Sequence, residues 1–204
     1  MNSKLNKRKT RRGAPTKGEP SARERILDTA VSLFYREGIQ PTGVDTVAAR
    51  SGISKTSLYR EFASKDELIC AVIEQQDRRY WAWWDDIVAR QPEARSQLRG
   101  LLQKIAERIA GPAFRGCPFL NTAIEFPDRA HPGRDLTCAN KAELRKRLAE
   151  LCKQMGVKNP VRLAARLALL IDGAYVSGLV VDTAHLEADL VESAFALIDR
   201  ELPR

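Results

Sequence analysis

The sequence is poor in the residues that build metal centres and disulfide frameworks. Its 204 residues include four cysteines and two histidines. They form no C-x-x-C pair and no zinc-finger spacing. We therefore expect no metal, no cofactor and reduced thiols, as is typical of a cytoplasmic protein.

Long apolar runs are also missing. The N-terminus is basic, but it is not followed by the apolar segment that a secretory signal needs. The most apolar stretch, residues 167–181, is interrupted by Asp172. It is shorter than the roughly 20 residues that a membrane-spanning helix requires. We expect a cytoplasmic location and no membrane partner.

Motifs of the common enzyme classes are missing too. There is no G-x-S-x-G, P-loop, H-E-x-x-H or dinucleotide-binding fingerprint, and neither His131 nor His185 has an evident nucleophile or metal partner. We expect that the protein is not an enzyme. A helical enzyme that works with Asp and Glu side chains is the remote alternative.

Basic charge is what the chain has in excess. It carries 34 Lys and Arg against 26 Asp and Glu, a formal net charge of +8, which favours an anionic partner such as nucleic acid. Residues 1–20 hold seven basic residues and one acidic residue, with Gly and Pro between them. We expect a disordered basic arm. It is either a solubilising tail or a segment that contacts DNA phosphates.

The remaining sequence has helical periodicity. Apolar residues recur at intervals of three and four, and no sustained alternation with turn signals is found. Ser21 with Glu24 predicts a capping box, and Gly38 predicts the end of the first helix. The fold class is therefore predicted to be all-α. Later helices are expected near residues 44–50, 54–62, 65–90, 93–110, 118–126, 133–155, 160–181 and 185–201.

The most informative pattern is the short helix pair at residues 44–50 and 54–62. Ala48 and Gly52 provide the small residue and the turn residue that two closely crossing helices need. Leu58 and Phe62 lie one turn apart on the apolar side. Five hydrogen-bonding side chains then lie on or near the outer surface: Lys55, Thr56, Ser57, Tyr59 and Arg60. Such a surface suits the major groove of DNA. The alternative is an ordinary helical hairpin with a solvated face.

The residues around this pair match a known family in order. The chain resembles the TetR family of transcriptional regulators over roughly residues 21–75. The matching segments are Arg25-Ile26-Leu27-Asp28-Thr29-Ala30, Leu33-Phe34, Gly38, Thr42, Val44, Val47-Ala48, Ser51-Gly52-Ile53-Ser54, Leu58-Tyr59, Phe62 and Ser64-Lys65-Asp66-Glu67-Leu68. The resemblance implies a helix-turn-helix DNA-binding domain at residues 21–64 and a helical ligand-binding and dimerisation domain at residues 65–204.

The resemblance also assigns roles in DNA binding. Residues 54–62 correspond to the recognition helix, Tyr59 and Lys65 to phosphate contacts, and Thr42 to a backbone contact at the start of the second helix. Lys55 and Thr56 are the residues we expect to read bases. Two positions depart from the family pattern, Gly43 where Ser or Thr is frequent and Glu61 where His is frequent.

Aromatic residues in the second half of the chain predict a ligand site. Trp84, Phe114, Phe119 and Tyr175 would surround a cavity in a TetR-like body, which suggests an apolar or aromatic effector. Ordinary core packing is the alternative for each of them.

Residues 115–127 add polar candidates for the same ligand site. This segment is similar to the LmrA/YxaF group of the family, which makes Asn121 and Glu125 candidates to orient an effector. Helix capping and surface charge are their competing roles. Cys117 precedes an expected helix start, where a thiolate is favoured. A buried, inert cysteine is the alternative, and we favour it.

The last two helices carry more apolar surface than one helical face requires. The resemblance implies that they pair with a second copy to form a homodimer. The alternative is that they complete the core of a monomer.

Together, the resemblance and the candidate sites lead us to expect a repressor that an effector releases from a palindromic operator in double-stranded DNA. An architectural DNA-binding protein without an effector is the alternative.

Overall fold

The computed structural model describes residues 20–128 and 130–203. The arm predicted at residues 1–20 lies almost entirely outside this range. Within the described residues the chain forms nine α-helices and no strand, which confirms the all-α prediction: α1 (Ala22–Glu37), α2 (Val44–Ser51), α3 (Lys55–Glu61), α4 (Lys65–Ala89), α5 (Ala94–Ile109), α6 (Pro118–Glu125), α7 (Pro132–Gln154), α8 (Pro160–Ser177) and α9 (Leu186–Glu201).

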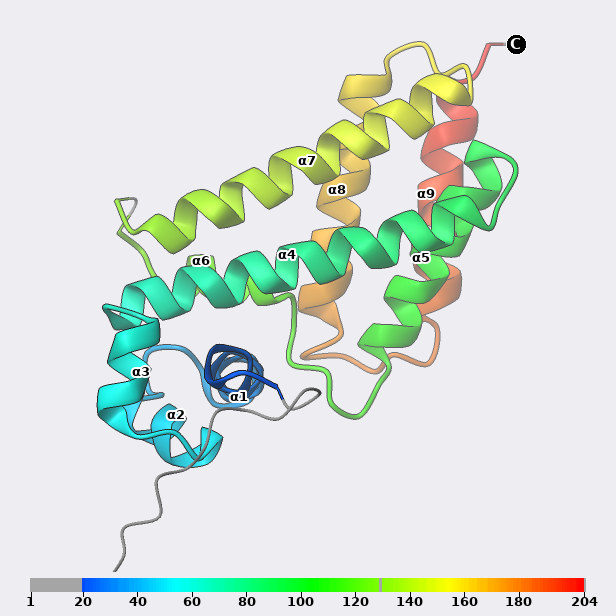
Figure 1. Cartoon of the computed structure of the whole chain (residues 1–204). Helices are drawn as coiled ribbons and strands as arrows, with labels where there is room; N and C mark the ends of the chain where they lie inside the picture. The colour runs from blue at the N-terminus through cyan, green and yellow to red at the C-terminus, as the bar shows by residue number, and fades with distance from the viewer. Residues whose placement is uncertain (1–19, 129, 204) are drawn as a thin grey trace, which may run out of the picture.

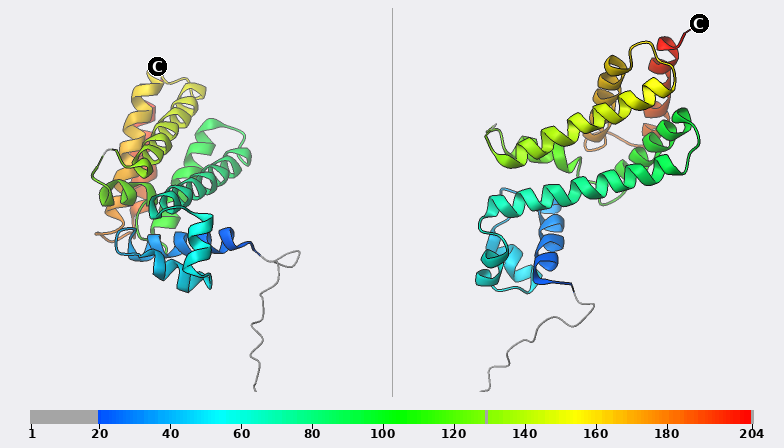
Figure 2. Two further views of the ribbon diagram at one scale, coloured as in Figure 1. Left: turned by 60° about the vertical axis from the view of Figure 1, so that its left-hand side comes forward. Right: turned by 45° about the horizontal axis from the view of Figure 1, so that its top comes forward.

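Two groups of helices divide the molecule. The first three helices, α1–α3, here called the head (residues 21–64), pack beneath the N-terminal end of α4 (Figure 1). The other helices, here called the body (residues 65–203), extend from there. The long helices α4 and α7 run side by side with α6 in contact with both, and α5 and α9 lie at the end of α4 away from the head (Figures 1 and 2).

Local capping fixes the start of the head. The Ser21 hydroxyl accepts a hydrogen bond from the Glu24 backbone N–H at 3.2 Å, and the Glu24 carboxylate accepts one from the Ser21 N–H at 2.7 Å. The hydrogen bond from the Ser21 backbone N–H to the carboxylate, and after it the nearby Ser21 side chain, lower the pKa of Glu24. The predicted capping box is confirmed, and α1 ends at Gly38 as expected.

The turn between α2 and α3 depends on one glycine. Gly52 has φ +68°, in the left-handed region that favours glycine. Ser54 then caps α3 by accepting a hydrogen bond from the Ser57 N–H at 3.1 Å. The inward residues Leu58 and Phe62 are 1% and 0% exposed. The predicted helix-turn-helix is therefore present.

One predicted helix end is wrong. We expected a helix over residues 160–181, but α8 stops at Ser177, and Val180 and Val181 lie in a turn. Helix α5 approaches closely at the next residue, Gly178. A Cβ there would come within 2.0 Å of Ile109 Cγ2. This close contact requires a glycine directly after the helix.

No helix in the described part of the chain is both long enough and apolar enough to cross a membrane.

Candidate DNA-binding surface and ligand cavity

Four of the seven predicted DNA-contact residues are exposed on α3, and three of them make no side-chain hydrogen bond or ion pair with other described residues. Thr56, Tyr59 and Arg60 lie on the side opposite the buried Leu58, and Tyr59 is 43% exposed. Their side chains form no hydrogen bond or ion pair with any other residue that the structure describes. They can therefore meet a partner without first losing an internal contact.

Lys55 and Ser57 lie on the same helix but are already engaged. The Lys55 ammonium is 2.8 Å from the Asp45 carboxylate on α2, and this hydrogen bond raises the pKa of Lys55. Both side chains are largely exposed, so the pair is weak and can exchange for a phosphate or a base. The Ser57 hydroxyl accepts a hydrogen bond from the Ser54 hydroxyl at 2.9 Å. Ser57 thus belongs to the cap of α3.

Thr42 and Lys65 hold the connection between α1 and α2. Thr42 is buried, and its hydroxyl donates to the Gly38 carbonyl at 2.6 Å. Lys65, at the start of α4, donates to the Gln40 carbonyl at 3.1 Å, and burial lowers its pKa. In this structure both side chains bind the protein's own backbone. Their predicted contact with DNA stays a prediction.

A cavity of about 220 Å³ opens inside the body, between α4, α5, α6, α7 and α8. Of the predicted ligand residues, Cys117, Phe119 and Tyr175 line it. Tyr80 and Trp83 of α4 add two aromatic walls. The Tyr80 ring lies 6.1 Å from that of Phe119 and 5.5 Å from that of Trp83, centroid to centroid. Burial raises the pKa of both tyrosines, Tyr80 and Tyr175, so their hydroxyls stay protonated at neutral pH.

Two of the predicted aromatic residues do not line this cavity. Phe114 stacks on Tyr175 with centroids 6.1 Å apart and supports the wall from outside. Trp84 is 3% exposed and packs edge-on against Trp81, with centroids 5.9 Å apart. It is not among the residues that line the cavity. Its neighbour Trp83 is, because one residue along a helix turns the side chain by about 100°.

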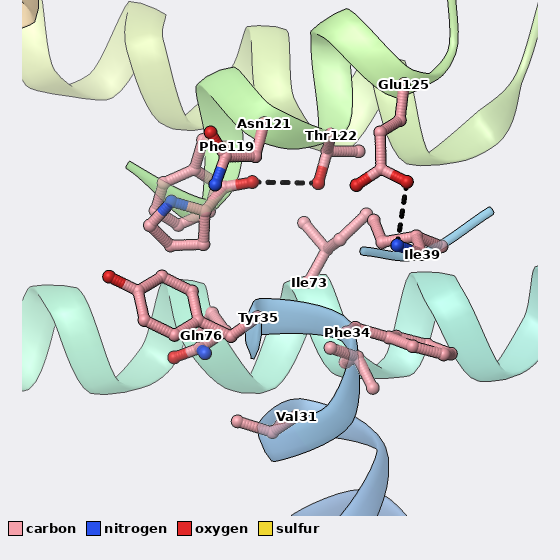
Figure 3. A pocket seen from close by; sticks show the side chains of 12 residues that line it. Val31, Phe34, Tyr35, Ile39, Ile73, Gln76, Phe119, Asn121, Thr122 and Glu125 are labelled. Carbon is pink, nitrogen blue, oxygen red and sulfur yellow. Dashed lines mark hydrogen bonds between the residues drawn. The ribbon is translucent and has the colours of Figure 1, made fainter. Parts of the chain in front are cut away.

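Asn121 and Glu125 line a different and smaller space. This crevice of about 30 Å³ lies where α1 of the head meets α4 and α6 of the body (Figure 3). One Glu125 carboxylate oxygen accepts hydrogen bonds from the Ile39 and Gln40 backbone N–H groups, each at 2.7 Å. Asn121 donates to the Arg115 carbonyl at 2.8 Å. Both side chains therefore hold backbone, and Glu125 joins α6 to the head.

A tyrosine of the head makes a second connection to the same region. The Tyr35 hydroxyl donates to the Gly116 carbonyl at 3.1 Å and accepts from the Arg115 backbone N–H at 2.9 Å. Both partners immediately precede α6. The two spaces share Phe119, which faces both the crevice and the large cavity. Helix α6 thus contacts the cavity at one end and the head at the other.

In the described part of the chain, no three His, Cys, Asp or Glu side chains come close enough together to hold a metal ion.

A three-helix head with an exposed second helix of a helix-turn-helix, joined to a helical body with an internal cavity, defines a DNA-binding regulator. Comparison with known proteins agrees with this class. The family model "Bacterial regulatory proteins, tetR family" matches residues 26–72. The crystal structure of SCO4454, a TetR-family transcriptional regulator from Streptomyces coelicolor, is 33% identical with a TM-score of 0.85, and the match covers 89% of this chain and 96% of that one.

Two curated relatives extend the comparison. The regulator YjdC of Escherichia coli K12 is 25% identical over 174 residues, which cover 82% of this chain and 91% of YjdC. The repressor KstR2 of Rhodococcus jostii RHA1 is 30% identical over 94 residues, 46% of each chain. The chain belongs to the TetR family of transcriptional regulators. Members of this family are not enzymes; they bind DNA and small-molecule effectors and form dimers.

Proposed function

We propose that the protein is a transcriptional repressor that binds a palindromic operator as a homodimer and leaves it when an effector occupies the body cavity. In this proposal residues 21–64 are the DNA-binding domain and residues 65–204 the ligand-binding and dimerisation domain. The likeness to the repressor KstR2, 30% identical over 94 residues, supports the sign of regulation.

The exposed face of α8 supports the dimer. Leu169 and Val176 are 67% and 53% exposed, and Val180 just beyond the helix is 77% exposed. Gly173 lies between Leu169 and Val176 with nothing near its Cα that a side chain would meet. Contiguous exposed apolar surface of this kind marks an interface. A twofold dimer presents two copies of α3 to one palindromic site.

Helix α6 connects the cavity to the head, and this connection supports the proposed effector response. It contributes Phe119 to the cavity and Glu125 to the backbone that precedes α2. An effector that displaces Phe119 would move α6 and thereby change how the head sits against α4. The operator affinity falls only if the effector binds the released arrangement better than the DNA-bound one.

The test is a fluorescence anisotropy titration of the purified protein against DNA from immediately upstream of its own gene, with scrambled DNA as the control and mass determination of the complex. Selective binding by two protomers is expected. Equal affinity for both DNAs, with a steep salt dependence, would instead fit an architectural DNA-binding protein.

A further inference from the structure

The body cavity has an unbalanced charge. Three cationic side chains line it, those of Arg79, Arg108 and Lys141, and no carboxylate does. A cation that is already paired with a carboxylate attracts an anionic ligand only weakly. Two of the three cations are paired in this way.

Arg79 and Lys141 have carboxylate partners just outside the cavity. Arg79 lies 2.9 Å from Asp28 of the head, with both side chains about half exposed. The Lys141 ammonium lies 2.5 Å from Asp172 of α8, and these side chains are 18% and 28% exposed. The Lys141 ammonium is also 3.8 Å from the Cys117 sulfur. The charges of these two cations are therefore neutralised by the carboxylates of Asp28 and Asp172.

Arg108 is the unbalanced cation. It lies in the last turn of α5 as an exposed residue, and its side chain forms no salt bridge or hydrogen bond with any residue in the described ranges. Its charge reaches the cavity walls, because it opposes the rise that burial causes in the pKa of Tyr80 and Tyr175. A guanidinium offers five N–H donors, arranged to grip a carboxylate through two parallel bonds.

The remaining polar groups of the cavity are donors or neutral. The hydroxyls of Tyr80 and Tyr175 are protonated, and neither has a hydrogen-bond partner among the residues that the structure describes. The rings of Tyr80, Trp83, Phe119 and Tyr175 supply flat apolar walls. The cavity therefore combines an aromatic slot with donors and one free positive charge.

We propose that the effector is a flat aromatic monocarboxylate, held by its ring between the aromatic walls and by its carboxylate at Arg108. This inference rests on the proposed function, since it names the chemical class of that effector. A neutral ring would fill the slot but leave Arg108 unpaired, and a cationic ring would meet like charge.

The test is calorimetric titration of the full-length protein with three ligands of nearly equal shape: 1-naphthoate, 1-naphthamide and the ammonium form of 1-naphthylmethylamine. We expect naphthoate to bind about tenfold more tightly than the amide, because a charge-assisted pair is added, and the amine to bind most weakly. Equal or tighter binding of the amide or the amine would overturn the proposal, and so would the failure of all three to bind.

Variants on α5 place the charge. Arg108→Gln should lower naphthoate affinity by about tenfold and leave amide affinity unchanged, whereas Arg108→Lys should retain part of the preference. Lys104→Gln removes the same charge one turn earlier, outside the cavity, and should change neither affinity. Unchanged naphthoate binding by folded Arg108→Gln would contradict the assignment.

The two proposals can fail separately. If naphthamide binds more tightly than naphthoate and weakens operator binding, the effector response is supported and the carboxylate assignment is wrong. If naphthoate binds more tightly but operator affinity does not change, the ligand class is supported and the effector response is wrong.

Discussion

The head and the body hold their functional side chains in different ways. In the head, Thr56, Tyr59 and Arg60 lie within five consecutive positions of one short helix, which begins at the Ser54 cap just after the turn at Gly52. In the body, the cavity is assembled from five helices that are distant in sequence. A DNA-reading surface can therefore be inferred from local patterns, whereas a ligand site depends on tertiary packing.

The largest expected effect comes from separating the two copies of the head. Leu169→Glu combined with Val176→Glu places two charges on the exposed apolar face of α8. We expect monomers in sedimentation velocity and a loss of operator affinity of about a hundredfold, because the second head no longer binds at high effective concentration.

Ile124→Glu is the matched control for that double variant. Ile124 is 75% exposed on α6 and is not part of the exposed face of α8. It should stay dimeric. A dimeric Leu169→Glu/Val176→Glu protein with normal operator affinity would contradict the assignment of this face.

Changes on α3 should separate base reading from phosphate binding. Thr56→Ala should reduce affinity for the operator by about five- to tenfold and leave scrambled DNA unaffected, since a base contact contributes about 1–3 kcal/mol of discrimination. Tyr59→Phe, which removes one hydroxyl, should lower the affinity for both DNAs by a similar, smaller factor. The assignment of Thr56 as a base contact is wrong if Thr56→Ala lowers the affinity for both DNAs equally in anisotropy titrations.

The basic arm should contribute only to the salt-dependent part of the DNA affinity. Deleting residues 2–18 removes all seven basic residues of the arm. If the arm contacts two or three phosphates, the slope of log affinity against log salt concentration should become shallower by about 2, at roughly 0.9 per phosphate. An unchanged slope would leave the arm as a solubilising tail.

The smallest effect is expected at the contact between head and body. Glu125→Gln replaces charge-assisted hydrogen bonds to Ile39 and Gln40 with neutral ones, which should destabilise the protein by about 1 kcal/mol in thermal unfolding. It should also reduce the effect of a cavity ligand on operator affinity.

Glu37→Gln on the exposed end of α1 removes the same charge without breaking a hydrogen bond seen in the described residues. This control variant should change neither the thermal stability nor the effect of a cavity ligand on operator affinity. An undiminished ligand effect in Glu125→Gln would remove α6 from the coupling.

What the sequence could predict follows from the range of the interactions involved. The capping box at Ser21, the turn at Gly52 and the cap at Ser54 involve partners within five residues, so their patterns are legible. Glu125 was expected to orient a ligand, yet it binds backbone 85 and 86 residues away. No local signal reveals a partner at that distance.

The charge of the cavity was missed for the same reason. Arg108 and Lys141 look like ordinary surface cations in their own helices, and only the packing of α5 and α7 around α4 brings them to one space. Trp84 was expected at the ligand site and Trp83 lines it instead, because the sequence alone does not fix which side of α4 faces the cavity. Phe119 and Tyr175 were found because large aromatic residues on apolar helices point inward on either interpretation.

The most direct test of the account is the operator affinity of the wild-type protein, measured by anisotropy in matched titrations with and without saturating 1-naphthoate and with the mass of the complex determined. We expect two protomers on each operator and a clearly weaker affinity in the presence of naphthoate. By linkage, operator DNA should weaken naphthoate binding by the same factor. Two protomers with the same affinity in both titrations, although calorimetry shows naphthoate bound, would contradict the coupling of cavity and head.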